Sequence, residues 1–355
     1  MYSNSFNIKK ITCLIAASII LVLTSCKDTS STLSDVLVGD EVASRTGFYF
    51  DTVISISIFS LEKDGNYSFK ERADKILDGC MQISDRYDKL LSAEKENSDI
   101  WNINNSNQKE TVVSKDTFEL IETSIKYANL SNGAFNPSLG SIISLWNFTS
   151  NDNQIIPDKK DIEKNIKHTD FCNVIVNKDK SSIIISDNDT KINLGAIAKG
   201  FIADKIKDYL CKEKVKSAII NLGGNVLLVG SKPNGSDFKV GIEKPFEGSS
   251  TYACVVNASD KSIVTSGVYE RYFEKDDKIY HHILDPKTGY PVENSLYSVS
   301  IISDKSVDGD ALSTACFVLG LDKGMELIEK TKGVEAVFIT NDYKLHTSSG
   351  FPKIK

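Results

Sequence analysis

Five residues in the C-terminal third of the chain carry side chains that could support phosphate chemistry. Asp310 and Thr314 lie four positions apart in a predicted helix, so they should share one face, with Ser313 beside them. His281 and His282 end a predicted strand that precedes this helix. Oxygen ligands and a histidine that converge on one place suit a hard cation and a phosphate group. The residues alone leave other roles open, because a first-turn aspartate can complement the helix dipole and a helical threonine can bond its own backbone.

A glycine-containing segment, KINLGAIAKG at residues 191–200, is a candidate anion site. We predict that a strand ends at Leu194, that Gly195 makes a turn, and that a helix follows with Phe201 among its apolar positions. Small residues at a helix N-terminus leave backbone N–H groups open to an anion such as a diphosphate. The segment is not a P-loop, because that motif would require lysine where Phe201 stands. A glycine turn that only allows close strand–helix packing is the alternative.

The composition places these candidates in an ordinary globular protein. Of the 355 residues, 41% are hydrophobic and 25% are charged, which permits one large domain or two smaller ones. The formal net charge of −6 argues against a general nucleic-acid binder, which would normally carry a basic face.

Helical and strand patterns are mixed without a regular βαβ rhythm, which predicts an α+β fold. The alternating Ile54, Ile56 and Ile58 predict a half-buried strand, and apolar residues at intervals of three or four predict a long helix at 69–90. Further helices are expected at about 114–132, around Trp146, from about Asp308 and at 322–331. Strands are expected at 173–176, 182–185, 217–221, 226–230, 238–242, 251–256, 263–265, 268–274 and 296–303.

The first 44 residues are expected to lie outside the folded domain. Lys9 and Lys10 precede a short apolar run and small residues, which is the pattern of a secretory signal and is shorter than the about 20 residues of a membrane-spanning helix. The sequence LTSC at 23–26 resembles the bacterial lipobox, whose cysteine is lipidated. We predict a signal peptide at 1–25, a lipid anchor on Cys26, a tether at 26–44 and a folded domain at 45–355 outside the cytoplasm, held at the cell membrane. An ordinary signal with a chance cysteine, or an uncleaved anchor, is the alternative.

Five cysteines remain within the predicted domain, and their scattered positions form neither a disulfide framework nor a CxxC pair. We expect them to be small buried hydrophobic residues. They are Cys80, Cys172, Cys211, Cys254 and Cys316.

Seven motifs, taken in their order along the chain, resemble the ApbE family of FAD:protein FMN transferases. They are GAFNPSLGSIISLW (133–146), NLGAIAKG (193–200), INLGGN (220–225), VGIEKP (240–245), TSGVYERYF (265–273), HHILDPKTGYP (281–291) and DGDALSTACFVLG (308–320). Each motif alone is weak evidence for the family, whereas seven motifs in the same order are specific for it. The resemblance covers nearly the whole predicted domain and implies an ApbE-like, T-fold-like arrangement of mixed antiparallel sheets with packed helices.

The resemblance also implies roles for particular residues. The side chains of Asp310, Ser313 and Thr314 match magnesium ligands of the family, and Ala196 would add its backbone carbonyl. His282 matches the family's histidine before the DPKTG turn and is our candidate base. Since successive side chains of a strand point to opposite faces, His281 should face away from the site. Positions that match flavin-binding stretches are Phe50, Ala134, Phe135, Asn136, Lys199, Thr265, Ser266, Gly267, His282 and Ile283.

The activity implied by the resemblance is a transfer of FMN. In such enzymes Mg²⁺ bridges the diphosphate of the substrate FAD, and a threonine hydroxyl of an acceptor protein attacks the phosphorus on the riboflavin side. AMP leaves, and FMN stays joined through a phosphoester bond. The expected partners are acceptor flavoprotein subunits of membrane redox complexes, such as those of the Rnf or Nqr type. This chain lacks the Ser/Thr-Gly-Ala-Thr acceptor signature, so it resembles the transferase rather than its target.

Two flavin-site positions depart from the family pattern. Asn193 stands where many members carry aspartate, which removes a negative charge near the expected metal. Glu94 stands where many members carry an aromatic ring that stacks on the ligand, so FAD should be retained less tightly. An FAD pyrophosphatase, with water in place of threonine, and a non-catalytic flavin-binding lipoprotein remain the alternatives. The intact Asp310, Thr314 and His282 argue against the binder, because mere retention of flavin needs neither metal nor base.

Overall fold

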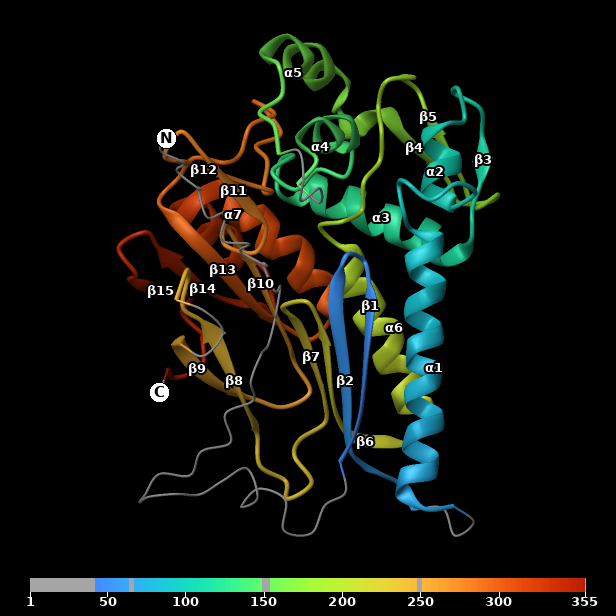
Figure 1. Ribbon diagram of the computed structural model, residues 1–355, viewed down its shortest axis with the longest axis vertical. Coiled ribbons are helices and arrows are strands. Elements are labelled where there is room, and N and C mark those ends of the chain that lie inside the picture. Colours follow the sequence, from blue (N-terminus) through green and yellow to red (C-terminus); the bar gives the residue numbers. More distant parts are fainter. Residues whose placement is uncertain (1–41, 64–66, 149–153, 248–250, 355) are drawn as a thin grey trace, which may run out of the picture.

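The computed structural model describes residues 42–63, 67–148, 154–247 and 251–354. Its largest element is an antiparallel sheet with the strand order β1–β2–β6–β7–β10–β13–β14–β15 (Figure 1). These strands are β1 (Ala43–Tyr49), β2 (Thr52–Leu61), β6 (Val215–Leu222), β7 (Asn225–Val229), β10 (Ser262–Gly267), β13 (Leu296–Ser303), β14 (Glu335–Thr340) and β15 (Leu345–Thr347). The expected α+β class and the mixed antiparallel sheets are confirmed.

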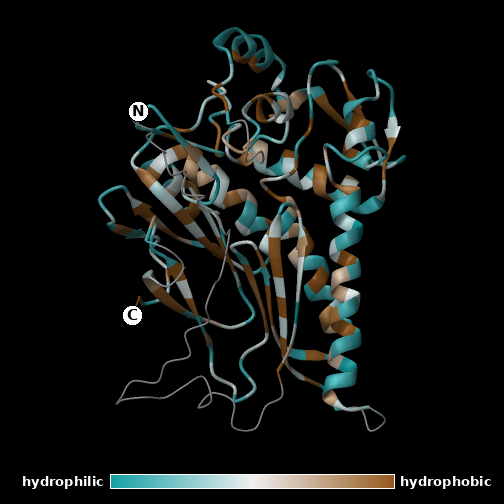
Figure 2. Ribbon diagram, in the orientation of Figure 1, coloured by the Kyte–Doolittle hydropathy of each residue, from teal (hydrophilic) through white to brown (hydrophobic). Residues whose placement is uncertain are grey.

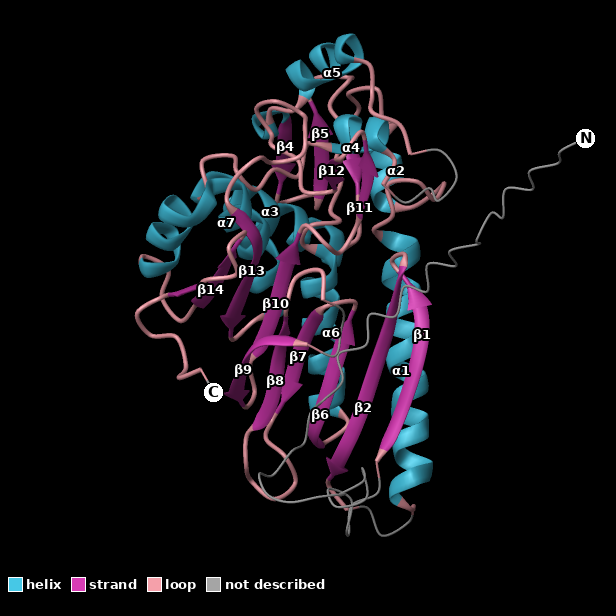
Figure 3. Ribbon diagram, turned by 60° about the vertical axis from the view of Figure 1, so that its left-hand side comes forward, coloured by secondary structure: helices cyan, strands magenta, loops and turns pink. Residues whose placement is uncertain are grey.

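Helices cover one face of the main sheet, and a two-stranded ribbon covers the other. Figures 1 and 3 place α1 (Phe69–Leu90) and α6 (Ala198–Lys212) on the same face, and α7 (Ser306–Glu329) packs against β10 and β13. On the opposite face, β8 (Phe238–Glu243) and β9 (Tyr252–Ala258) form an apolar cluster with residues of the sheet. The central strands of the main sheet are therefore covered on both faces, whereas one face of β1 and β2 is half-buried or exposed.

A smaller region lies beyond one end of the main sheet (Figure 3). It contains α2 (Asp99–Asn104), α3 (Lys115–Leu130), α4 (Gly140–Trp146), α5 (Lys159–Asn165), the 3-10 helices η2 (Ile166–His168) and η3 (Phe171–Asn173), and the strands β3 (Thr111–Val112), β4 (Val174–Asn177) and β5 (Ser182–Ile185). The hairpin β11 (Tyr272–Lys275) and β12 (Lys278–His281) joins this region through an apolar cluster centred on Trp146.

Local sequence signals explain the best-predicted elements. Ser68 and Glu71 form a reciprocal capping box at the start of α1, which begins and ends where its apolar periodicity does. Ile54, Ile56 and Ile58 of β2 are each 0% exposed. Figure 2 shows the same alternation along β2 as brown segments separated by paler ones. The period-two pattern therefore buried one complete face of the strand.

Several expected boundaries are wrong. No strand ends at Leu194, because the main-chain N–H groups of Ile192 and Asn193 donate to Asn104 and Pro137 instead of to a strand partner. The expected strand 268–274 begins only at Tyr272, after a turn. Strand β1 begins at Ala43, two residues before the expected start of the domain.

The five cysteines of the described residues differ in their burial. Cys80, Cys254 and Cys316 are buried as expected. Cys172 and Cys211 are exposed, so the prediction that they are buried was wrong.

The predicted signal, Cys26 and most of the tether lie outside the described residues. Among the described residues, no helix has both the length and the apolar character needed to cross a membrane.

Candidate active site

Three side-chain hydroxyls meet between α7 and β10, those of Ser266, Ser313 and Thr314, and Asp310 lies one helical turn earlier on α7. We call these four residues the oxygen cluster. Ser266 Oγ lies 2.8 Å from Ser313 Oγ and 3.3 Å from Thr314 Oγ1. Ser313 Oγ donates to the main-chain carbonyl of Asp310 at 3.0 Å. The helical spacing thus brings the predicted metal ligands to one side of α7, and β10 adds the hydroxyl of Ser266 from the sheet.

The carboxylate of Asp310 is buried, with 3% of the residue exposed. Its Oδ2 accepts the N–H of Gly200 at 2.8 Å, and its Oδ1 lies 3.9 Å from Lys199 Nζ. The N-terminus of α6 was expected to bind a diphosphate through such N–H groups. The N–H of Gly200 instead binds a carboxylate of the protein itself, so the anion that this position holds is Asp310.

A close approach of α6 and α7 makes this contact possible (Figure 1). A Cβ at Gly200 would lie only 2.4 Å from the carbonyl oxygen of Ser306, so glycine is required there. Asp204 of α6 accepts the N–H groups of Ser306 and Val307 at 2.8 and 3.0 Å and so caps the N-terminus of α7. Burial raises the pKa of Asp204 to about 6, and these two hydrogen bonds oppose the rise. Gly200 therefore allows two helices to pack closely, a role that the sequence did not assign to it; the expected packing glycine was Gly195.

His282 directly follows β12, and one nitrogen of its ring is fixed. Nδ1 lies 3.1 Å from the carbonyl oxygen of Arg271, to which the main-chain N–H of His282 also donates. Because a carbonyl can only accept, Nδ1 carries the proton and Nε2 is the basic nitrogen. Burial, followed by the charge of Arg271, lowers the pKa of His282 to about 3. The ring is therefore neutral at pH 7, which is the form that a general base requires.

The neighbouring His281 lies on a different side of β12. It is 6% exposed, its Nε2 lies 3.0 Å from the carbonyl oxygen of Val292, and its ring packs edge-on against Phe317. It also lines a cleft of about 510 Å³ together with Asn294 and Tyr297. The alternation of a strand thus gives His281 a packing role, as expected.

The turn after His282 is anchored by the Trp146 cluster. Trp146 Nε1 donates to the carbonyl of Gly289 at 2.7 Å. Gly289 has φ = 74°, and a Cβ at this residue would lie 2.8 Å from Ile162. Helices α4 and α5 therefore hold the DPKTG turn, and with it the end of the strand that carries the histidines.

Several predicted flavin-binding residues use their side chains for packing. Phe135 and Ile283 are 2% and 4% exposed and belong to the main core. Thr265 Oγ1 bonds Ser300 Oγ at 2.7 Å, on the face of β10 opposite to Ser266. The amide of Asn136 donates to Thr169 at 2.8 Å and its Oδ1 accepts from Ser138. Phe135, Thr265 and Ile283 would therefore contact a ligand through their main-chain atoms.

The other predicted positions lie in turns and at element ends. Phe50 is half-buried in the turn between β1 and β2, and Glu94 is exposed after α1. Ala134, 9% exposed, follows α3, and Gly267 ends β10. In the turn before α6, Ala196 is half-buried and Asn193 Oδ1 accepts the N–H of Gly195 at 2.8 Å.

Glu270 and Arg271 are site residues that the sequence analysis missed. The turn at 268–271 replaces the expected strand. The carbonyl of Arg271 contacts His282, and the exposed Glu270 lies close enough to Lys199 and Asp310 for their charges to shift its pKa. The atoms around Glu270 raise its pKa to about 7, Lys199 lowers it, and Asp310 raises it further. The motif TSGVYERYF contained a signal that could have revealed the turn. Its two adjacent charged residues, Glu270 and Arg271, are unfavourable inside a buried strand.

The oxygen cluster fits a hard divalent cation. Carboxylate and hydroxyl oxygens are the ligands that Mg²⁺ accepts. The ion pair between the buried Asp310 and Lys199 is long, at 3.9 Å, so it balances the carboxylate charge only in part. A cation bound at Asp310 would supply the rest of that balance.

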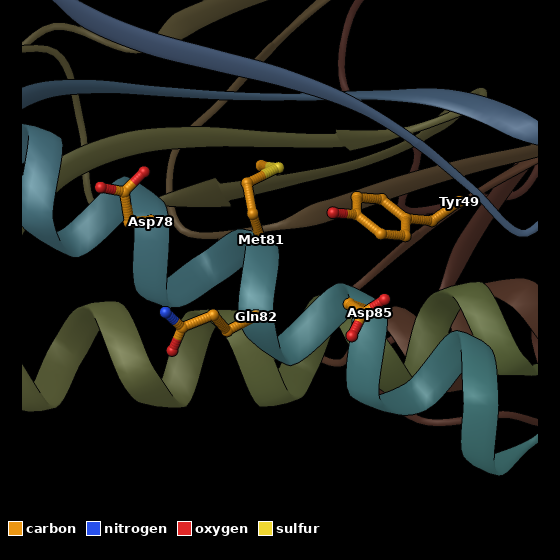
Figure 4. A pocket seen from close by; sticks show the side chains of 5 residues that line it. All are labelled: Tyr49, Asp78, Met81, Gln82 and Asp85. Carbon is orange, nitrogen blue, oxygen red and sulfur yellow. The ribbon is translucent and has the colours of Figure 1, made fainter.

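Other hollows and polar clusters are separate from this site. A cavity of about 420 Å³ lies between β1 and α1 and is lined by Tyr49, Asp78, Met81, Gln82 and Asp85 (Figure 4). None of these is a predicted site residue. His168, Asp187 and Asp189 also come together, but Nδ1 of His168 already bonds Asp187 at 2.7 Å.

This chain belongs to the ApbE family, whose family model matches residues 50–338. It is 36% identical over 269 residues to the FAD:protein FMN transferase of Klebsiella pneumoniae, covering 76% of this chain and 83% of the relative. It is also 36% identical over 288 residues to the enzyme of the same name from Treponema pallidum, covering 77% and 79%.

Solved structures agree with the family. The ApbE protein of Thermotoga maritima superimposes with a TM-score of 0.79 at 28% identity, covering 87% of this chain and 97% of that one. The flavin transferase ApbE of Vibrio cholerae has a TM-score of 0.76 at 21% identity, covering 88% and 98%, and supports the fold alone.

Proposed function

We propose that this protein is an FAD:protein FMN transferase, which moves FMN from FAD to a threonine hydroxyl of an acceptor protein and releases AMP. One observation carries the proposal: the carbonyl of Arg271 fixes the ring of His282 with its proton on Nδ1, and Lys199 relates this ring to the oxygen cluster. Nζ of Lys199 lies 3.9 Å from Oδ1 of Asp310, and the charge of Lys199 also lowers the pKa of His282. Membership of the ApbE family and the names of the relatives support the same activity.

In the proposed reaction each residue has a defined task. The acceptor hydroxyl gives its proton to Nε2 of His282, and its oxygen bonds to the phosphorus on the riboflavin side of FAD. The bond from that phosphorus to the AMP oxygen breaks, and AMP leaves with the electron pair. The Nδ1–H bond to the carbonyl of Arg271 stabilises the ring as it becomes positive. Lys199 offsets negative charge on the phosphoryl oxygens.

Asp310, Ser313, Thr314 and the carbonyl of Ala196 would hold Mg²⁺. The bound ion would neutralise part of the diphosphate charge. Asn193 and Glu94 would weaken retention of the ligand, the first through a missing charge and the second through missing aromatic stacking.

Release of AMP tests the activity directly. The purified domain is incubated with FAD and Mg²⁺, with and without an acceptor domain that carries the Ser/Thr-Gly-Ala-Thr signature. AMP that forms only with acceptor, together with a flavin-labelled acceptor, supports the transferase. AMP without acceptor identifies an FAD pyrophosphatase, and no AMP under either condition identifies a flavin-binding protein.

The proposed location is the outer side of the cell membrane, with a lipid on Cys26 as the anchor. The acceptors would then be flavoprotein subunits of membrane redox complexes, including the Rnf and Nqr types. Cys26→Ala should move the full-length protein out of the membrane fraction, while the isolated domain, which lacks this residue, keeps its activity. Membrane attachment and gel mobility that survive the substitution would exclude the lipid anchor.

A further inference from the structure

The turn between β1 and β2 has an unusual main-chain conformation. Phe50 and Asp51 both have φ = 55°, in the left-handed region. This region is unfavourable for a bulky side chain such as that of phenylalanine, and tight hairpin turns normally use asparagine or glycine there. Such a turn persists only where surrounding groups hold it.

Two side chains from distant parts of the chain hold this turn. Asp88 Oδ1 of α1 accepts the N–H of Phe50 at 3.0 Å. On the other side, Arg271 Nη2 donates to the carbonyl of Asp51 at 3.1 Å and approaches the carbonyl of Phe50 at 3.4 Å. Nη2 thus reaches two carbonyls of the same turn.

The main chain of Arg271 contacts the candidate base, His282. Its carbonyl oxygen accepts both the N–H and Nδ1–H of His282, each at 3.1 Å. The guanidinium and the carbonyl of one residue therefore reach the turn with Phe50 on one side and the candidate base on the other. No other described residue has hydrogen bonds to both Phe50 and His282.

We propose that Arg271 is a positioning residue for FMN transfer, with its guanidinium holding the turn that presents Phe50 to the flavin and its carbonyl holding His282 in the Nδ1–H tautomer. The inference rests on the proposed function, because that function assigns Phe50 to the flavin and His282 to proton transfer. It predicts that flavin binding and the rate of the chemical step both depend on Arg271. Asp88 contacts the turn and Lys95 but not His282, so it should affect binding alone.

Three variants separate these effects. Arg271→Met keeps the length of the side chain and removes its donors, so we expect FAD affinity to fall about tenfold or more. The turnover number at saturating FAD should also fall about tenfold, because a carbonyl at position 271 that is no longer anchored through the guanidinium holds His282 less rigidly. Arg271→Lys should restore part of the affinity, since an ammonium can still donate to the turn. Asp88→Asn keeps an acceptor for the N–H of Phe50, but a neutral amide accepts less strongly than a carboxylate and no longer pairs with Lys95, so FAD binding should weaken. The saturated turnover number should stay near that of the wild type.

Arg72 is a matched control. Its guanidinium also donates to two main-chain carbonyls, those of Glu62 and Glu213, but near the start of α1 and away from the site. Arg72→Met should lower the unfolding temperature without changing FAD affinity or turnover. An Arg271→Met protein that behaves in the same way, with only its stability reduced, would overturn the proposal.

Two readouts do not require turnover. FAD affinity is measured by quenching of flavin fluorescence, and the tautomer of His282 by long-range ¹H–¹⁵N NMR of the histidine rings. We expect the Nδ1–H signature of His282 in the wild type and its loss or averaging in Arg271→Met. The double variant Arg271→Met/Asp88→Asn should bind FAD more tightly than the product of the single effects predicts, because both residues hold one turn. Strict additivity would contradict the shared turn.

These measurements also separate the inference from the proposed function. A wild type that binds FAD but transfers no FMN would exclude the transferase, while the affinity and NMR results would still decide the role of Arg271. Should Arg271→Met fail to fold, Arg271→Lys and Asp88→Asn give the same comparison. Unchanged affinity and an unchanged tautomer in both would overturn the inference.

Discussion

The oxygen cluster is held by groups buried in a helix and a neighbouring strand, whereas the turns at Phe50 and Glu94, which are predicted to face the flavin, are tied by half-buried or exposed side chains. Ser266, Asp310 and Ser313 are 8%, 3% and 0% exposed. By contrast, Glu94 is exposed, and its neighbour Lys95 pairs with Asp88 at the surface. Substitutions in these turns can therefore change how tightly the ligand is held without moving the side chains of the oxygen cluster. Both departures from the family pattern lie in such segments.

The largest effect is expected at His282. His282→Ala should lower the turnover number by roughly a hundred- to ten-thousandfold, which is the usual contribution of a general base. FAD affinity should change much less, because metal and main-chain contacts would carry most of the binding in the proposed complex. Turnover and affinity are measured separately by AMP release and flavin fluorescence.

His281→Ala provides the matched control, since it removes the adjacent imidazole on the other side of β12. It should cost stability through lost packing but little activity. Normal turnover of the saturated His282→Ala enzyme would end the assignment of the base.

The second-largest effect on turnover is expected at Asp310, the buried carboxylate of the oxygen cluster. Asp310→Asn keeps an oxygen that can accept the N–H of Gly200 but removes the charge that balances the cation. Turnover at saturating FAD should fall about a hundredfold or more. Asp310→Ala should lose activity and also stability, by about 1–3 kcal/mol, because the Gly200 N–H is left without its acceptor.

Asp308→Asn is a control on the same helix, since Asp308 bonds the hydroxyl of Tyr127 rather than the cluster. It should retain most of its activity. Near wild-type turnover of Asp310→Asn at saturating Mg²⁺ would remove Asp310 from the mechanism.

The pH dependence of the reaction tests the environment of His282. Its pKa is lowered to about 3, so the neutral base persists as the pH falls below the ordinary histidine range. A base with the usual pKa of about 6.5 would lose about thirtyfold in kcat/KM by pH 5. We expect a much smaller loss over this range, measured at saturating Mg²⁺.

Glu270 is the group that could obscure this result, since its pKa is raised to about 7. The profile should therefore be repeated with Glu270→Gln, which removes that titration. An acid limb near pH 6.5 in this variant would contradict a neutral His282 at low pH.

The smallest effect is expected at the exposed edge of the flavin-facing segments. Glu94→Tyr should restore the aromatic ring that many family members carry and tighten FAD binding by a factor of about 2 to 10 through stacking. Turnover should not rise. Glu96→Tyr, two residues further on and also exposed, is the control. Equal gains in both variants would show that position 94 has no special role.

Much of the fold follows from local patterns in the sequence. The bounds of α1 and β13 were predicted from periodicity, because one face of each element must be buried. The strands expected at 217–221 and 226–230 form as β6 and β7, and the turn between them holds Gly223 and Gly224, which both adopt the positive φ that glycine allows. The resemblance to the ApbE family likewise came from motifs that can be read in order along the chain.

The tertiary structure alone decided which groups meet at the site. Asp310 receives its hydrogen bond from Gly200, 110 residues earlier, and Arg271 reaches a carbonyl 220 residues away. The strand expected before Leu194 failed for the same reason, since Asn104 and Pro137 took its hydrogen bonds. Periodicity reports which face of an element is buried, but it contains no information about which distant element covers that face. The sequence by itself therefore determined the elements and the family, whereas the partners of Asp310 and His282 depended on long-range packing.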